Sequence, residues 1–216
     1  MTNAAATPGT SAPSAAEQAQ AVVLEAQDWF RDKEFTTDWV TNKIRRWHRF
    51  LRRFRDRPVD LLEVGSFEGR SALFFLNYLP QSRLTCIDLF PGPLEARFDR
   101  NMQGFGDRLT KIKGSAIAHL DRLAGEKRQY HFIYLDAGKK RDHVLAQALL
   151  TWPLLRPGGL LMIDDYDWGK DRPPEGRPHD AINIFLDLHK DEIEILWKDG
   201  QVILKRLAPP PPAAAA

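Results

Sequence analysis

Residues 61–71 read LLEVGSFEGRS, an apolar run that stops at a turn containing two glycines. Gly65 permits a tight turn after the run, and Gly69 allows a helix and a ligand to approach closely. The helical pattern SALFFLNYL follows at 71–79. This stretch therefore predicts a strand, a ligand-binding turn and a helix, in that order.

The same order recurs along the chain. Apolar, strand-like runs stand at 58–64, 83–90, 109–113, 130–136 and 156–165. Helical patterns follow three of them, at 71–79, 115–123 and 141–155. Nearly continuous apolar runs are typical of parallel strands that are covered on both faces. The alternation predicts an α/β fold with a doubly wound, mostly parallel sheet.

The last part of the chain departs from this alternation. A helical pattern over 179–190 precedes two alternating runs, at 192–197 and 201–206, which flank KDG at 198–200. Asp-Gly between two such runs is a strong signal for a β-hairpin. We therefore expect the sheet to close with an antiparallel hairpin.

Composition divides the 216 residues into four parts. The ends, 1–16 and 208–216, are rich in Ala, Pro, Ser and Thr, so they offer little apolar surface to offset the entropy of ordering. We predict disordered tails there, a helical lead-in over 17–57 and a folded domain over 58–207. The composition of the tails also suggests a bacterial source.

Several classes of protein are not indicated. The N-terminus lacks the pattern of a signal peptide, and no apolar run approaches the roughly 18–20 residues of a membrane span. The single cysteine, Cys86, lies in an apolar run and is expected to be a packing residue. These features predict a cytoplasmic protein with no internal disulfide.

The formal net charge is only +2, so overall charge does not indicate a nucleic-acid partner. One segment, NKIRRWHRFLRRFRDR at 42–57, is strongly basic. Ile44, Trp47 and Leu51 recur in it at helical spacing, with arginines between them. The favoured interpretation is a docked amphipathic helix with a solvated basic face. An anionic partner, RNA or a membrane surface, is the alternative.

Acidic residues end the expected parallel strands, at the sheet edge where doubly wound folds bind ligands. Asp88 ends the strand that follows the glycine turn, where an acidic side chain is placed to bind the hydroxyls of a ribose.

Asp136, Asp164 and Asp165 end two further strands. If those strands are neighbours, about 4.8 Å apart, the three carboxylates meet, and such oxygen ligands suit Mg²⁺ or Ca²⁺. The alternative is that Asp164 and Asp165 are turn or capping residues, because consecutive strand residues point in opposite directions.

Five motifs occur in order: EVGSFEGRS, TCIDLF, IKGS, FIYLD and LLRPGGLLMIDDY. Together they resemble the class I S-adenosylmethionine-dependent methyltransferases. The resemblance covers about 58–207 and is greatest to the bacterial branch of tylosin- and mycinamicin-type sugar O-methyltransferases; catechol O-methyltransferase is a more distant relative. It implies a Rossmann-like, seven-stranded methyltransferase fold. The function implied is O-methylation, with S-adenosyl-L-methionine, of a small hydroxylated acceptor such as a sugar or catechol-like diol.

The resemblance also implies roles for individual residues. The cofactor site would be lined by Glu63, Gly65, Ser66, Phe67, Gly69, Asp88, Leu89, Ser115 and Asp136. Among these, Asp88 would bind the ribose, and Leu89 would lie beside the adenine. Ser115 is also a candidate N-cap of the next helix, a role compatible with a place near the adenine edge. Asp136, Asp164 and Asp165 would hold Mg²⁺ or a similar cation, which acidifies an acceptor hydroxyl.

This chain leaves the pattern of that branch at one position. The branch continues from the strand-end aspartate as D-G-S-H, whereas this chain has D-A-G-K, so Lys139 replaces a histidine. Lys139 could act as a deprotonated base, neutralise the aspartates in place of a metal, or be a solvated loop lysine. Asp136, Lys139 and His143 are the candidate catalytic residues. His179 is a further candidate base, although single histidines are usually structural.

Three rival functions remain open. One is a cofactor-binding protein without methyl transfer, and another is an RNA methyltransferase that uses the basic face of 42–57. The third is a nicotinamide-dependent dehydrogenase. The segments expected to shape the acceptor pocket, 90–108 and 166–180, carry no recognisable substrate code. We expect a small-molecule substrate, and homo-oligomerisation is left open.

Overall fold

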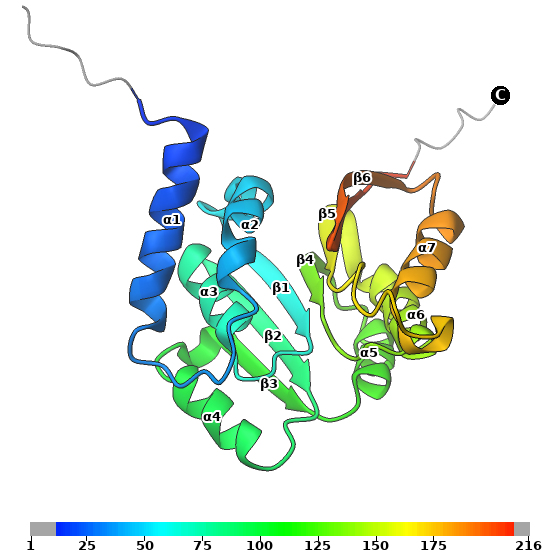
Figure 1. The fold of residues 1–216 in the computed structure, drawn as a ribbon, viewed down its shortest axis with the longest axis horizontal. Coiled ribbons are helices and arrows are strands. Elements are labelled where there is room, and N and C mark those ends of the chain that lie inside the picture. The colour runs from blue at the N-terminus through cyan, green and yellow to red at the C-terminus, as the bar shows by residue number, and fades with distance from the viewer. Residues whose placement is uncertain (1–11, 210–216) are drawn as a thin grey trace, which may run out of the picture.

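The computed structural model describes residues 12–209, which form a three-layer α/β structure around one sheet (Figure 1). The sheet has seven strands in the order β3-β2-β1-β4-β5-β7-β6. The strands are β1 (Val59–Val64), β2 (Ser82–Asp88), β3 (Leu109–Lys113), β4 (Tyr130–Leu135), β5 (Leu155–Ile163), β6 (Ile193–Asp199) and β7 (Gln201–Arg206). The first five are parallel, and β7 runs antiparallel to both β5 and β6. The predicted fold and closing hairpin are confirmed.

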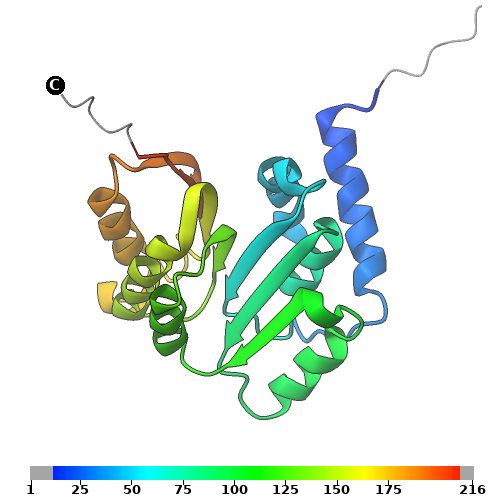
Figure 2. The same ribbon diagram turned by 180° about the vertical axis from the view of Figure 1, so that it is seen from behind.

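Helices cover both faces of the sheet (Figures 1 and 2). They are α1 (Ala15–Phe30), α2 (Ile44–Leu51), α3 (Arg70–Tyr78), α4 (Pro93–Asn101), α5 (Ala116–Gly125), α6 (Arg141–Thr151) and α7 (His179–Leu188). Buried side chains of α1 to α4 pack on one face of the sheet, and those of α5 to α7 pack on the other. Short 3₁₀ turns are η1 (Thr41–Lys43), η2 (Arg52–Phe54), η3 (Gly106–Arg108), η4 (Trp152–Leu154) and η5 (Pro174–Gly176). None of the helices within residues 12–209 combines the length and apolar composition needed to cross a membrane.

The strand order reverses between β1 and β4, and ligands bind at such a point in doubly wound sheets. Backbone hydrogen bonds bring the ends of neighbouring strands level with one another. The Asp136 N–H donates to the Val64 carbonyl at 2.8 Å, and the Asp164 N–H donates to the Leu135 carbonyl at 2.9 Å. Side chains that follow β1, β4 and β5 therefore share one edge of the sheet.

Helix α1 begins inside the segment predicted to be a tail. Ser14 caps it: the Ser14 hydroxyl accepts the Glu17 N–H, and the Glu17 carboxylate accepts the Ser14 N–H at 2.7 Å. This capping box starts the helix at Ala15. Most of the two predicted tails, residues 1–11 and 210–216, lies outside the described residues.

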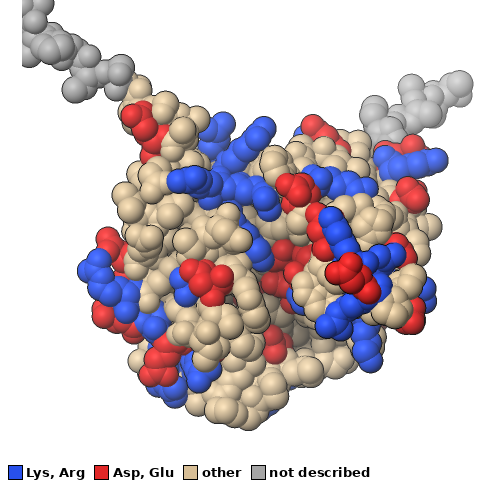
Figure 3. Space-filling model, viewed as in Figure 1, with Lys and Arg blue, Asp and Glu red and all other residues tan. Residues whose placement is uncertain are grey.

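The basic segment 42–57 docks on the domain as a helix. Ile44, Trp47 and Leu51 of α2 are fully buried, and its arginines lie between them on the outer side. Figure 3 shows Lys and Arg side chains gathered over α2. The interpretation of this segment as a docked amphipathic helix is confirmed.

Helix α4 lies in a region where the sequence showed no helical pattern. Phe98 and Asn101 are its buried side chains, and tertiary contacts of Asn101 hold its end in place. The Asn101 amide donates to the carbonyls of Glu34 and Glu68 at 2.9 and 2.8 Å, and it accepts the Glu34 N–H. Because polar contacts of Asn101 hold this helix, the sequence shows no hydrophobic periodicity that would predict it.

Candidate active site

A cavity of about 1110 Å³ opens at the carboxyl-terminal edge of the sheet. Its wall contains most of the predicted site residues, namely Gly65, Ser66, Phe67, Asp88, Leu89, Ser115, Asp136, Lys139, His143, Asp164 and Asp165. Acidic side chains are visible in a hollow between the two halves of the molecule (Figure 3). Two predicted residues, Glu63 and Gly69, lie behind this wall.

Glu63 is a fully buried carboxylate beneath the glycine turn. The Ser71 hydroxyl donates to Glu63 Oε1 at 2.5 Å, and the Cys86 thiol donates to Oε2 at 3.3 Å. Burial raises the pKa of Glu63 to about 7, and the Ser71 hydrogen bond opposes this shift. Cys86 is buried as well, and burial raises the pKa of its thiol, which agrees with the packing role predicted for it.

The two glycines of the turn pack against protein on different sides. Gly65 has φ +93°, and a Cβ there would lie 2.5 Å from the Asp136 carbonyl oxygen. Gly69 has φ +86° and precedes α3, and a Cβ there would lie 3.0 Å from Met102 Sδ beside α4. Gly65 thus makes the predicted tight turn. The close approach at Gly69 is to Met102 and α4 rather than to the cavity.

Asp88 holds two loops that border the cavity. Its Oδ2 accepts the Phe67 N–H at 2.9 Å, and its Oδ1 accepts the Phe90 N–H at 3.0 Å. A carboxylate oxygen has two lone pairs, so each oxygen keeps one for a ligand hydroxyl. Leu89 and Ile117, both exposed, supply apolar surface to the same cavity.

Ser115 occupies the N-cap position of α5, but its hydroxyl makes no capping hydrogen bond. It lines the cavity instead. Ser115 thus stands at the N-cap position without capping the helix through its side chain, and its hydroxyl is available to a ligand.

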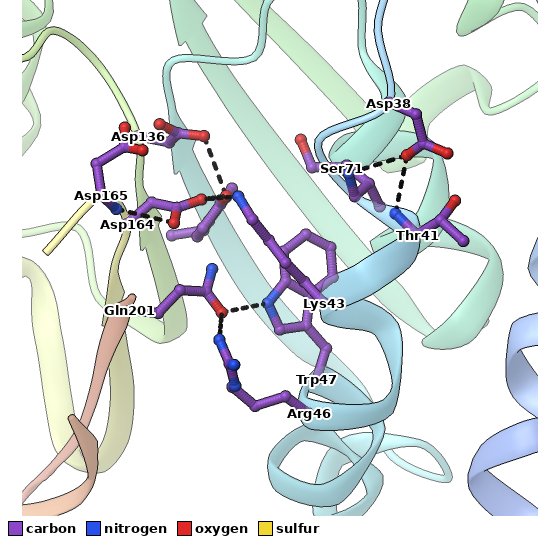
Figure 4. A network of polar contacts seen from close by, with 12 residues as sticks. Asp38, Thr41, Lys43, Arg46, Trp47, Ser71, Asp136, Asp164, Asp165 and Gln201 are labelled. Atoms are coloured by element: carbon purple, nitrogen blue, oxygen red, sulfur yellow. Dashed lines mark hydrogen bonds and ion pairs between the residues drawn. The ribbon is translucent and has the colours of Figure 1, made fainter. Parts of the chain in front are cut away.

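Three aspartates meet at the ends of β4 and β5 (Figure 4). The Tyr134 hydroxyl lies 3.0 Å from Asp136 Oδ2 and also contacts Asp164, so its one proton serves one carboxylate at a time. Asp165 has φ +62°, which ends the strand alternation, and its N–H donates to Asp164 Oδ1 at 2.8 Å. This backbone turn lets consecutive aspartates serve the same site.

Two lysines pair with these aspartates. Lys139 Nζ lies 2.8 Å from Asp136 Oδ1 and also contacts Asp165. Lys43, from the N-terminal lead-in, contacts Asp164. Lys139 is therefore not a solvated loop lysine, and its placement agrees with the alternative in which it neutralises the aspartates.

The electrostatics of the cluster follow from burial and from these pairings. Burial and the neighbouring Asp164 raise the pKa of Asp136 to about 6, while Lys139 and Lys43 oppose the shift. Burial and the two aspartates raise the pKa of Tyr134 well above its usual range, so it stays a hydroxyl.

The two candidate histidines lie apart from this network. His143 is an exposed residue of α6 that lines the cavity, and in the described part of the chain no polar contact joins it to the aspartates. His179 Nδ1 pairs with Asp180 at 2.9 Å, and its ring lies 4.8 Å from that of Tyr166. His179 is thus held by its own helix and a neighbouring ring, as a structural histidine is.

The sequence missed one wall of the cavity, which the N-terminal lead-in supplies. It consists of Thr37, Asp38, Trp39, Val40, Asn42, Lys43 and Arg46. Asp38 accepts the N–H groups of Val40 and Thr41 and pairs with Arg70 at 2.9 Å. An aspartate before a helical pattern is a capping signal that could have been read. Nothing local identifies Lys43, whose partner is 121 residues away.

The cavity fits S-adenosylmethionine. Asp88 offers free lone pairs to a diol, and Leu89 and Ile117 offer apolar surface to an adenine ring. Asp136 on the cavity wall supplies a carboxylate for a cationic sulfonium and ammonium group. A cradle with these three chemistries suits an adenosine carrying a cationic tail.

A divalent cation does not fit the aspartates as they are placed. Mg²⁺ and Ca²⁺ need free carboxylate oxygens, whereas each of these aspartates has an ammonium partner. Among residues 12–209, no three His, Cys, Asp or Glu side chains are grouped so as to hold a metal ion. The metal site predicted at Asp136, Asp164 and Asp165 is not confirmed.

Comparison with known proteins agrees with this geometry. A family model described as a methyltransferase domain matches residues 62–166. Residues 62–166 are thus similar to this family of methyltransferases. The matched residues run from within β1 to just beyond β5, and so contain the glycine turn and all three aspartates.

Two curated relatives are also named as methyltransferases. The O-methyltransferase hkm8 of Aspergillus hancockii is 29% identical over 114 residues, which are 50% of this chain and 43% of that protein. The tapetum-specific methyltransferase 1 of Arabidopsis thaliana is 29% identical over 155 residues, 68% of this chain and 64% of that protein. The chain thus spans less than two thirds of the length of these relatives. One is fungal and one is a plant protein, and a rhamnosyl O-methyltransferase of Mycobacterium tuberculosis is 25% identical over 138 residues. Relatives of such varied source do not confirm the predicted bacterial branch.

A solved methyltransferase structure shares the fold of this chain. MycE, a methyltransferase from the mycinamycin biosynthetic pathway, was crystallised with Mg, S-adenosylhomocysteine and mycinamycin VI. Its TM-score to this chain is 0.64 at 19% identity, covering 86% of this chain and 54% of MycE. The class I methyltransferase fold is thus confirmed, while sugar specificity is not.

Proposed function

We propose that this chain is an S-adenosylmethionine-dependent O-methyltransferase that acts on a small hydroxylated acceptor with a diol. One observation carries the proposal: the diol-binding carboxylate of Asp88 and the aspartate–lysine cluster open into the same cavity. The Asp88 carboxylate suits the ribose of the cofactor, and the aspartate–lysine cluster suits a hydroxyl of the acceptor. The names of the curated relatives support transfer to oxygen.

The residues on the β1–β2 side would hold the cofactor. Asp88 would accept hydrogen bonds from the ribose hydroxyls, and Leu89 with Ile117 would cover the adenine. Glu63 and Ser66 would lie toward the methionine end. When bound, the cofactor supplies an electrophilic methyl group, which an oxygen of the acceptor takes up in place of its proton.

The residues on the β4–β5 side would hold the acceptor. Lys139 is paired with two carboxylates and would donate a hydrogen bond to an oxygen of the acceptor. Asp136, whose pKa is raised to about 6, is placed to take the hydroxyl proton. Trp39 and Trp168 line the cavity as partly exposed aromatic side chains and would exclude water from an apolar acceptor.

Other sequence-based hypotheses are not part of this proposal. Divalent-metal assistance is supported by the Mg in MycE, but the lysine-paired aspartates here do not fit an ion. A cytoplasmic location, a bacterial source and homo-oligomerisation stay predictions. The RNA methyltransferase, the dehydrogenase and the inactive cofactor-binding protein become outcomes of the test below.

Calorimetry with S-adenosylhomocysteine and with NAD tests the proposal. We expect S-adenosylhomocysteine alone to bind, and Asp88→Ala to weaken it about 10- to 100-fold, because a charged hydrogen-bond partner contributes about 1.5–3 kcal/mol. Asp107→Ala, which changes an exposed aspartate of η3, is the control and should bind like the wild type.

Transfer of a labelled methyl group to catechol, to a sugar diol and to RNA then identifies the acceptor class. Methylation of a diol supports the proposal. Binding of NAD without S-adenosylhomocysteine would support a dehydrogenase, and labelling of RNA alone would support the RNA methyltransferase. Binding of S-adenosylhomocysteine without labelling of any of the three acceptors would support the inactive cofactor-binding protein. Each of these results contradicts the proposal.

A further inference from the structure

Three carboxylates and two ammonium groups meet at the ends of β4 and β5. Figure 4 shows the three aspartates with Lys43 beside them. Lys139 pairs with Asp136 and Asp165, and Lys43 pairs with Asp164. Every carboxylate therefore has a cationic partner. The two lysines together carry the same positive charge as one divalent ion.

The Lys43–Asp164 pair is inside the protein. The side chain of Lys43 is 16% exposed, and that of Asp164 is 3% exposed. Removing one charge of such a pair leaves the other buried without a partner, at a large cost in stability. Lys43 is therefore part of the cluster rather than a mobile surface cation.

The backbone of Lys43 is held before any ligand binds. Asp38 accepts the N–H groups of Val40 and Thr41 at 3.1 and 2.9 Å, which fixes the start of η1. Ile44, the next residue, is fully buried and begins α2. These contacts direct Lys43 from the lead-in toward the ends of β4 and β5, as Figure 4 shows.

A divalent cation and these lysines compete for the same oxygens. An ion bound by the three aspartates would lie beside two ammonium groups, and like charges that close repel strongly in a partly buried site. An ion could reach Asp136 and Asp165 only if Lys139 left them, and it could reach Asp164 as well only if Lys43 also left. For Lys43 this would mean moving a buried side chain on a fixed backbone.

We propose that Lys43 and Lys139 together replace a divalent ion in this active site. They neutralise Asp136, Asp164 and Asp165. An ammonium has three N–H donors, and Lys139 uses two on carboxylates, so it keeps one for an acceptor oxygen in the cavity. This inference rests on the proposed function and makes the methyl transfer independent of a bound metal.

Binding of Mn²⁺, followed by electron paramagnetic resonance, tests the inference directly. The wild-type protein should show no saturable Mn²⁺ binding up to about 1 mM, far above the range of dedicated cytosolic metal sites. Its affinity for S-adenosylhomocysteine should be the same with and without EDTA. Saturable Mn²⁺ binding by the wild type that Asp164→Asn abolishes would overturn the inference.

Removing the lysines should create the metal site that they replace. We expect the Lys43→Met/Lys139→Met variant to bind one Mn²⁺ at least about 10-fold more tightly than the wild type. Lys140→Met, which changes an exposed lysine outside the cavity wall, is the matched control and should behave like the wild type. A double variant that is folded by circular dichroism and binds Mn²⁺ no better than this control contradicts the inference.

The single variant Lys139→Met covers the case in which the double variant does not fold, because the Lys139 side chain is 34% exposed and its loss leaves the buried Lys43–Asp164 pair intact. It should also bind Mn²⁺ more tightly than the control, and equal binding again contradicts the inference. Binding of S-adenosylhomocysteine is measured separately. Failure of that binding would count against the proposed function, whereas the Mn²⁺ result concerns the lysines alone.

Discussion

Glu63 and Asp88 end neighbouring strands, yet their surroundings give them different chemistry. Glu63 is fully buried with a hydroxyl and a thiol as partners, so burial dominates and raises its pKa to about 7. Asp88 accepts two backbone N–H groups at the cavity wall. The sequence shows two similar carboxylates at strand ends, and only their solvation and partners distinguish them.

The raised pKa of Glu63 makes stability depend on pH. Between pH 4.5 and about 7, the folded protein keeps a proton on Glu63 that the unfolded chain has lost, so stability falls as pH rises through this window. Glu63→Gln removes the titrating carboxyl group and with it this pH dependence of stability. The free energy of unfolding of the variant minus that of the wild type should increase by up to about 3 kcal/mol across the window.

Urea denaturation at pH 4.5 to 8 measures this difference. Glu175→Gln, at an exposed position in η5, is the control and should follow the wild type at every pH. If the Glu63→Gln curve also runs parallel to that of the wild type, the carboxyl group does not carry the raised pKa.

At the scale of elements, the turn between β1 and α3 joins the two halves of the sheet. Gly65 donates its N–H to the Ile87 carbonyl of β2 at 2.8 Å, while its Cα faces the backbone of Asp136 after β4. The turn is therefore packed between both neighbouring strands. A sequence pattern shows the glycine, but not what it approaches.

Substitution of this glycine should be costly for two separate reasons. At φ +93°, Gly65→Ala adds the strain of a left-handed backbone, about 1–2 kcal/mol, and its Cβ would overlap the Asp136 carbonyl at 2.5 Å. We expect a total loss above about 3 kcal/mol in urea unfolding. Gly104→Ala, at φ +97° with no atom within 4 Å of the added Cβ, should lose only the strain. Equal losses for the two variants would show that the contact with β4 does not matter.

On the scale of the whole molecule, the N-terminal lead-in completes both the core and the cavity. Trp47 of α2 is fully buried and donates its indole N–H to Gln201 at 3.1 Å on β7. Its ring lies 5.4 Å from that of Tyr134 on β4, next to the aspartates. The lead-in is thus joined to the sheet beside the site to which it contributes Lys43.

Loss of Trp47 should therefore destabilise the whole protein. Trp47→Ala removes a large buried side chain and is expected to cost about 3–5 kcal/mol in the free energy of unfolding. Trp39→Ala is the control, because Trp39 is 59% exposed on the cavity wall and should cost less than about 1 kcal/mol. Urea denaturation followed by circular dichroism measures both, and similar costs would mean that α2 is not part of the cooperative core.

Most of the fold was predictable because its signals are local. Apolar runs, the Gly65 turn and the Asp-Gly hairpin each identify an element from a few adjacent residues. The approximate edge location of Asp88, Asp136 and Asp164 followed, since parallel strands present their ends at one edge. Helix α4 was missed because the polar contacts of Asn101, and not periodicity, anchor it.

The sequence by itself determined the parallel sheet, its closing hairpin and the edge at which the acidic residues lie. Hydrophobic periodicity and turn residues are properties of neighbouring positions, so a single sequence shows them. Only the tertiary structure decided what those acids face. Asp165 lies at the site because its backbone is left-handed, and Lys43 pairs with Asp164, which is 121 residues away in the sequence. Such pairing depends on burial and on distance in space, which no local pattern records.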